Sequence, residues 1–167
     1  HGERALVDPG WLDEANGGLI AIAGQDSDIG RLLLAQRGEA ALQRAQWWRE
    51  RFPNRLYLQA TRIERAGQEA FLAGALDLGA RLALPLLAGN DVRFLEREDF
   101  EAHEARVCIH AGRVLADPRR PRDYTPEQYL KPPAAMAQRV ADLPALLANT
   151  AELARRCNLA PSFGKYY

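Results

Sequence analysis

The chain has 167 residues, of which 47% are hydrophobic and 26% charged, and its 22 Lys and Arg residues balance 22 Asp and Glu residues. This composition is ordinary for a soluble globular protein with one core, and the net charge indicates neither a nucleic-acid nor a membrane partner. The apolar runs are only a few residues long, which excludes a membrane helix of roughly 20 residues. Cys108 and Cys157 lack metal-binding or redox spacing, which favours a reducing, cytoplasmic location.

The first part of the chain alternates between strand and helix patterns. Asp8 as N-cap and Pro9 at the first helical position are typical of a short helix, which Gly17 and Gly18 end. The other predicted elements, in chain order, are a strand at 19–23, helices at 29–36 and 39–52, a strand at 55–60, a helix at 64–80 and a strand at 82–89. This alternation predicts a parallel sheet with crossover helices, either an open doubly wound sheet or part of a barrel.

The last part of the chain is predicted to be helical, with one long loop. A helix is expected at 97–112, followed by a loop at 113–124 that is rich in proline and arginine. A new helix is predicted to start with Thr125 as N-cap, proline at the first helical position and Gln128 at N3. A final helix at 142–157 has an apolar stripe at helical spacing.

Polar residues follow each predicted strand. Gln25, Thr61 and Asp91 occupy the carboxyl ends of the three strands, where parallel α/β proteins place their chemistry. Arg93 follows Asp91 by two residues, and two such side chains on an extended segment point the same way. A histidine at position 93 would suggest a metal site, whereas an arginine leaves the role of this pair open.

Metal and phosphate motifs are scarce elsewhere in the sequence. It contains no phosphate-binding glycine loop and no nucleophile elbow. Of its three histidines, His1 is terminal, and His103 and His110 lie two helical turns apart, too far to share an ion. We therefore expect His103 and His110 to be structural or solvent-facing.

The loop "DPRRPRD" gathers Arg119, Arg120 and Arg122 between prolines. These arginines could contact a phosphate backbone, or they could pair with acidic helix faces of the same protein. No aromatic residues alternate with them, which favours the intramolecular alternative.

Two long stretches carry a family resemblance. "GNDVRFLEREDFEAHEARVCIHAGRVLADPRRPRDYTPEQYL" and "ADLPALLANTAELARRCNLAPSFGKYY" closely resemble the alpha subunit family of the proteobacterial replicative DNA polymerase III, in the later part of its N-terminal PHP (polymerase and histidinol phosphatase) domain. The likeness extends back through "FPNRLYLQATR", "GLIAIAG" and "DPGWL". It implies an α/β fragment of a seven-stranded (β/α) barrel with parallel strands, followed by a helical C-terminal segment.

The resemblance also implies a division of the chain. Residues 1–115 would be the later part of the PHP barrel, and residues 116–167 would be the Arg/Pro loop and helices leading toward the polymerase palm. The first barrel strands, with the family's HxH motif, would precede His1. The polymerase aspartates would follow Tyr167, so no residue of this chain is expected to be catalytic.

The family pattern gives "DVR" a specific interpretation. Metal-binding PHP domains carry D-x-H at the end of a late strand and a cysteine after an earlier one, and this sequence has Asp91, Arg93 and Gln25 at those places. A guanidinium stays protonated and cannot donate a lone pair to a metal, but it can pair with a carboxylate. The resemblance therefore implies a vestigial site of these three residues, without metal or cofactor in this fragment.

A noncatalytic PHP segment would support the polymerase core and dock the proofreading exonuclease subunit, epsilon. The rival hypothesis is a metal-dependent PHP phosphoesterase, either a 3'-5' exonuclease or a pyrophosphatase. A third hypothesis is direct DNA binding through the arginine loop, although we expect DNA contact by this fragment to be weak or absent. No membrane partner is expected, and exposed barrel edges could be covered by a second copy of the fragment.

Overall fold

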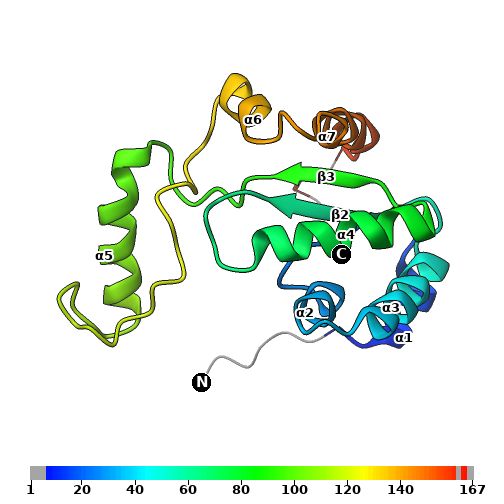
Figure 1. Ribbon diagram of the computed structural model, residues 1–167, viewed down its shortest axis with the longest axis horizontal. Coiled ribbons are helices and arrows are strands. Elements are labelled where there is room, and N and C mark those ends of the chain that lie inside the picture. Colours follow the sequence, from blue (N-terminus) through cyan, green and yellow to red (C-terminus); the bar gives the residue numbers. More distant parts are fainter. Residues whose placement is uncertain (1–6, 161–162, 165–167) are drawn as a thin grey trace.

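Three short parallel strands form the sheet around which the other elements are arranged (Figure 1). The computed structural model describes residues 7–160 and 163–164. The strands are β1 (Ala21–Ala23), β2 (Leu56–Thr61) and β3 (Leu86–Gly89), in the order β1-β2-β3. Both pairings are parallel, which confirms the predicted sheet with crossover helices. The described strands form an open sheet, and the barrel stays a prediction.

Seven α-helices and one 3₁₀ helix accompany this sheet within the described residues. They are α1 (Pro9–Ala15), α2 (Asp28–Leu34), α3 (Gly38–Arg51), α4 (Gln68–Leu82), the 3₁₀ helix η1 (Arg97–Asp99), α5 (Phe100–His110), α6 (Pro133–Arg139) and α7 (Ala145–Arg156). The side chain of Asp8 accepts a hydrogen bond from Gly10 N, which confirms the predicted cap of α1.

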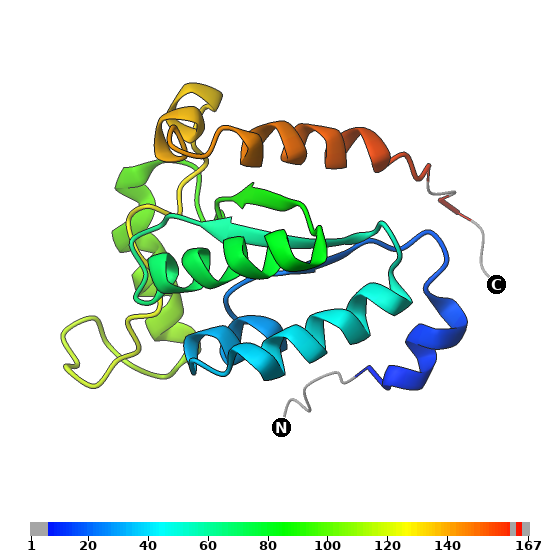
Figure 2. The same ribbon diagram turned by 45° about the vertical axis from the view of Figure 1, so that its right-hand side comes forward.

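Helices cover both faces of the sheet (Figure 2). Helices α2, α3 and α4 lie on one side and α7 on the other, so β2 is buried along most of its length. Successive strand residues point to opposite faces. Leu58 therefore belongs to the larger cluster with Ile29 and Phe71, whereas Tyr57 joins Leu153 in a smaller cluster under α7.

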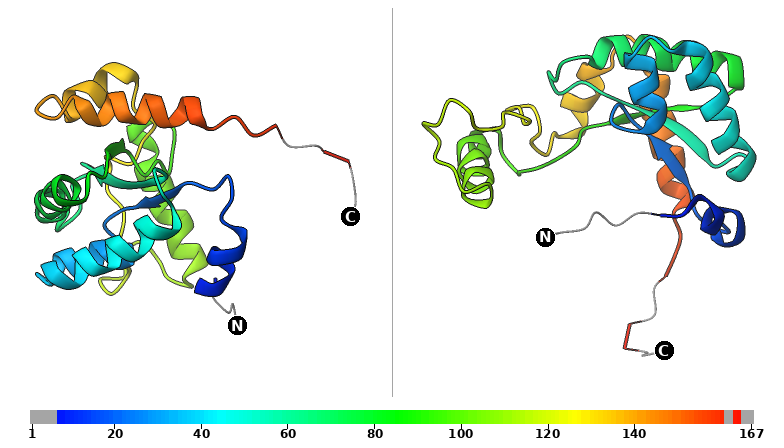
Figure 3. Two further views of the ribbon diagram at one scale, coloured as in Figure 1. Left: turned by 90° about the vertical axis from the view of Figure 1, so that its right-hand side faces the viewer. Right: turned by 90° about the horizontal axis from the view of Figure 1, so that it is seen from below.

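Helix α5 stands apart from the sheet (Figures 1 and 3). The chain leaves β3, runs through η1 into α5 and returns by a long loop, which meets the outgoing segment at a parallel bridge between Phe94 and Tyr129. The predicted division at residue 115 stays a prediction, although α7 from the second part packs directly on β3 from the first.

The structure corrects several predicted boundaries. Helix α4 begins at Gln68 rather than residue 64, since Gly67 has a φ of +82°, and it continues to Leu82. Ala83 then adopts a left-handed conformation, so β3 is shorter than the predicted strand at 82–89. Helix α7 begins at Ala145 rather than residue 142.

The predicted helix start at Thr125 is wrong. Gln128 Oε1 does accept a hydrogen bond from Thr125 N, as in a capping box, but no helix follows. Lys131 precedes Pro132 and Pro133, and a residue before proline is disfavoured in the α conformation, so the first turn cannot propagate. The next helix, α6, begins only at Pro133.

Candidate functional site

A pocket lies at the carboxyl ends of the three strands. Its volume is about 320 Å³. Its lining residues come from the ends of β1 and β2 and from the loops after all three strands: Ile22, Gly24, Gln25, Asp26, Ser27, Gln59, Thr61, Arg65, Asp91 and Arg93. The structure thus brings together all four residues that the sequence placed at this edge, including the three of the expected vestigial site.

Asp91 and Arg93 form an ion pair in this pocket. Arg93 Nη2 lies 2.8 Å from Asp91 Oδ1, and the two side chains are 44% and 31% exposed. The expectation that an extended segment points both side chains the same way is wrong, because β3 ends at Gly89 and Asp91 has a φ of +43° in the turn that follows. Aspartate tolerates this left-handed conformation better than most residues. The turn, and not an extended strand, brings the carboxylate to the guanidinium.

Gln128 completes the set of contacts around Asp91. Its Nε2 donates to Asp91 Oδ2 at 2.8 Å and to the Asp91 carbonyl at 3.2 Å, while Arg93 N donates to the Gln128 carbonyl at 2.8 Å. Both carboxylate oxygens of Asp91 are therefore engaged by the protein itself. No local pattern indicates this role, since the residues around Gln128 predict a helix start.

Gln25, Asp26 and Thr61 also have partners within the protein. Gln25 Nε2 donates to the carbonyl of Ala66 at 2.8 Å, and Arg65 Nη1 lies 3.1 Å from Asp26 Oδ2. Thr61 Oγ1 accepts a hydrogen bond from Gln68 Nε2 at 2.9 Å. The pocket therefore holds two carboxylates, each already paired with an arginine.

These residues do not fit a metal ion. Within residues 7–160 and 163–164, no three His, Cys, Asp or Glu side chains gather closely enough to hold one. A guanidinium repels a cation and offers it no lone pair. His1, the terminal histidine, lies outside the described residues.

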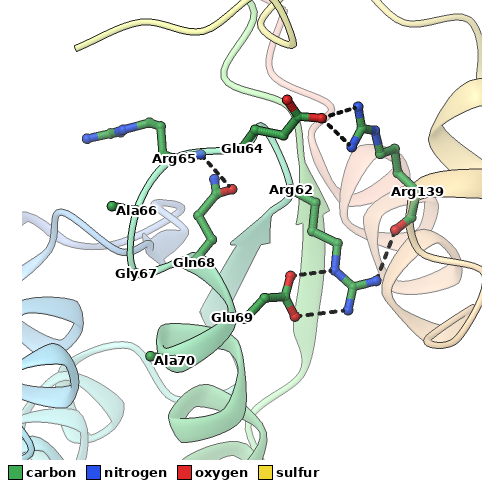
Figure 4. Close-up of a pocket in the computed structure, with 9 residues that line it drawn as sticks. All are labelled: Arg62, Glu64, Arg65, Ala66, Gly67, Gln68, Glu69, Ala70 and Arg139. Atoms are coloured by element: carbon green, nitrogen blue, oxygen red, sulfur yellow. Dashed lines mark hydrogen bonds and ion pairs between the residues drawn. The ribbon is translucent and has the colours of Figure 1, made fainter. Parts of the chain in front are cut away.

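A second pocket, of about 720 Å³, lies between the start of α4 and α6 (Figure 4). Arg62 is its central cation, with Nε 3.0 Å from Glu69 Oε1 and Nη1 2.6 Å from Asp142 Oδ1. The hydrogen bond to Asp142 and the charge of Glu69 raise the pKa of Arg62 above its ordinary value. Arg62 also donates to the carbonyl of Arg139, so it fastens the end of β2 to the segment between α6 and α7.

A buried carboxylate, that of Glu127, pairs with Arg139, which lines the second pocket. Glu127 and Lys131 are each 1% exposed, and Lys131 Nζ lies 3.4 Å from Glu127 Oε2. Arg97 and Arg139 also pair with this carboxylate. Burial raises the pKa of Glu127, but the charges of Arg139, Lys131 and Arg97 outweigh it and hold the pKa below its usual value.

The three arginines of the loop have different surroundings. Arg120 forms an ion pair with the buried Glu104 of α5, and Arg119 Nε lies 3.4 Å from Asp117 Oδ1. Arg122 is exposed and forms no ion pair with any described residue. The loop is thus fastened to its own protein mainly through Arg120, as the intramolecular alternative predicts.

Comparison with known proteins shows which protein family the chain resembles. The chain is 47% identical over 163 residues to DNA polymerase III subunit alpha of Pseudomonas aeruginosa and 44% identical over 165 residues to that of Escherichia coli K12, covering 97% of this chain in both cases. The chain is homologous to one region of DNA polymerase III subunit alpha. It spans about 14% of the length of these two alpha subunits.

The chain is also 43% identical over 167 residues to DNA polymerase III subunit alpha of Neisseria meningitidis. The resemblance to the proteobacterial alpha subunit family is thereby confirmed for nearly the whole chain. No protein-family model matches the sequence. Among the described residues, no helix is both long and apolar enough to cross a membrane.

Replacing Glu127 tests the importance of the buried carboxylate. We expect Glu127→Gln to lower the free energy of unfolding by roughly 3 kcal/mol, because Lys131 would be left buried without a compensating charge. Glu152→Gln is the matched control, since Glu152 pairs with Arg155 on the surface and its loss should cost less than about 0.5 kcal/mol. Urea unfolding measures both variants, and equal losses would contradict the assigned role of Glu127.

Proposed function

We propose that this chain is a noncatalytic PHP segment of a DNA polymerase III alpha subunit that acts in DNA replication in the cytoplasm. Its role is to support the polymerase core and to dock the proofreading exonuclease subunit, epsilon. The observation that carries the proposal is the ion pair between Asp91 and Arg93 at the strand ends.

The position of this ion pair is informative. Parallel α/β folds place their chemistry at the carboxyl ends of the strands, where Asp91, Arg93 and Gln25 line one pocket. In a metal-dependent PHP phosphoesterase this place would hold ligands for an ion. Here Arg93 supplies the positive charge, and Gln128 takes the second oxygen of Asp91. The pocket is a remnant of a metal site whose charge balance is maintained without metal.

The proposed structural role is supported by contacts that join the C-terminal helices to the sheet. Helix α7 packs on β3, and Arg62 binds Asp142 between α6 and α7, so the part of the chain leading toward the palm is fastened to the sheet. β1 pairs only with β2 among the described strands, and Ile22 is exposed on it. Other parts of the alpha subunit, or a second copy, would cover this edge.

The metal content of the intact alpha subunit tests the noncatalytic proposal. We expect zinc, manganese and iron far below one ion per chain after purification without chelators, because Arg93 occupies the place of the cation. Asp91→Asn should leave the metal content unchanged. One or more bound ions per chain, together with exonuclease or pyrophosphatase activity lost in Asp91→Asn, would establish the phosphoesterase alternative instead.

Cross-linking tests the docking role. When the intact alpha subunit is mixed with epsilon and treated with a short cross-linker, we expect cross-links to residues of this segment, mapped by peptide mass spectrometry. Helix α5 is the exposed helix after β3 and is the first place to look. Cross-links confined to other parts of the alpha subunit would contradict docking by this segment.

A further inference from the structure

A third pocket lies beside α5, outside the strand-end pocket. Its volume is about 330 Å³, and its lining is almost entirely made of hydrogen-bond donors: Arg93, His103, Arg106, Val107, His110 and Tyr124. His103, Arg106 and His110 are spaced by three and four residues, so they share one face of α5. None of the described residues that line this pocket carries a carboxylate.

His103, one of the lining residues, has an unused donor. It is 7% exposed, and its Nε2 is buried without a hydrogen-bond partner among the described residues. Arg106 Nη2 lies 3.3 Å from His103 Nδ1. A guanidinium can only donate, so Nδ1 accepts and, in the neutral ring, Nε2 carries the hydrogen. A buried N–H without an acceptor is unusual in a folded protein and calls for a partner.

The surroundings of His103 favour an anionic partner. Burial holds the pKa of His103 below its ordinary value, and the charges of Arg106 and Arg93 lower it further while the charge of Glu104 raises it. Arg106 has no ion-pair partner in the described part of the chain. The adjacent Glu104 pairs with Arg120 and does not line the pocket. The guanidinium of Arg93 lies over the Tyr124 ring, 5.5 Å from its centre.

We propose that this pocket binds a phosphate group. Arg106 and two imidazoles approach it from α5, and Arg93, which also pairs with Asp91, approaches it from the loop after β3. Together they offer more donors than the two oxygens of a carboxylate can accept. A phosphate has enough oxygens to bond Arg106, Arg93 and His103 Nε2 together. The phosphate can belong to free inorganic phosphate or to a DNA strand, since both present the same oxygens.

Chemical protection of Arg106 in the intact alpha subunit tests this site. Phenylglyoxal modifies accessible guanidinium groups, and peptide mass spectrometry reports each arginine separately. We expect inorganic phosphate, added at constant ionic strength, to slow the modification of Arg106. Arg155 is the internal control, because it is exposed on α7 and pairs only with Glu152 in the described structure. Its modification should not change.

A substitution and two further ligands sharpen the test. His103→Phe keeps an aromatic ring against Tyr124 but removes the donor, and it should raise the phosphate concentration for half-protection roughly tenfold. Protection by phosphate but not by a short oligothymidylate supports the site and identifies free phosphate as its ligand, whereas protection by the oligonucleotide at a lower phosphate concentration identifies a DNA strand. Absent protection, equal slowing at Arg155, or equal protection by sodium glutamate would overturn the proposal.

Discussion

The buried carboxylate of Glu127 is the constraint on which the arrangement around the strand ends depends. A carboxylate that is 1% exposed is stable only when cations surround it, and here Arg97, Lys131 and Arg139 do so. These cations come from η1, from the segment that contains Glu127 and from α6. One charge therefore draws three separate parts of the chain together and fixes residues 125–131 against the loop after β3.

The position of residues 125–131 then determines which side chains contact Asp91 in the strand-end pocket. Gln128 is fully buried next to Glu127 and bonds Asp91 from one side, while Arg93 pairs with it from the other. Asp26 has its own partner in Arg65. A pocket whose carboxylates are matched by internal cations has no electrostatic need for a bound ion. This physical balance supports a structural role for a segment that lies where related folds carry out chemistry.

The sequence predicted the strands, their parallel pairing and the residues that would meet at their ends. These features depend on local patterns: apolar runs, a clear N-cap at Asp8 and polar residues directly after each strand. The helix at Thr125 was predicted from equally clear capping residues and is wrong, because Pro132 and Pro133 stop it. The role of Gln128 could not be predicted, since its bond to Asp91 joins residues 37 apart in the chain. The ion pair of Asp91 and Arg93 was expected, but the left-handed turn that forms it was not.

We propose that Arg93 replaces a metal as the partner of Asp91, and a double-mutant cycle in chelator-containing buffer tests this replacement most directly. Asparagine tolerates the left-handed conformation of residue 91, so Asp91→Asn changes the charge with little backbone strain. We predict that Asp91→Asn lowers the free energy of unfolding and that this loss shrinks by about 0.5–1 kcal/mol when Arg93→Met is also present. An increase in stability on Asp91→Asn, as expected for carboxylates that await a metal, or strictly additive effects of the two substitutions, would contradict the claim.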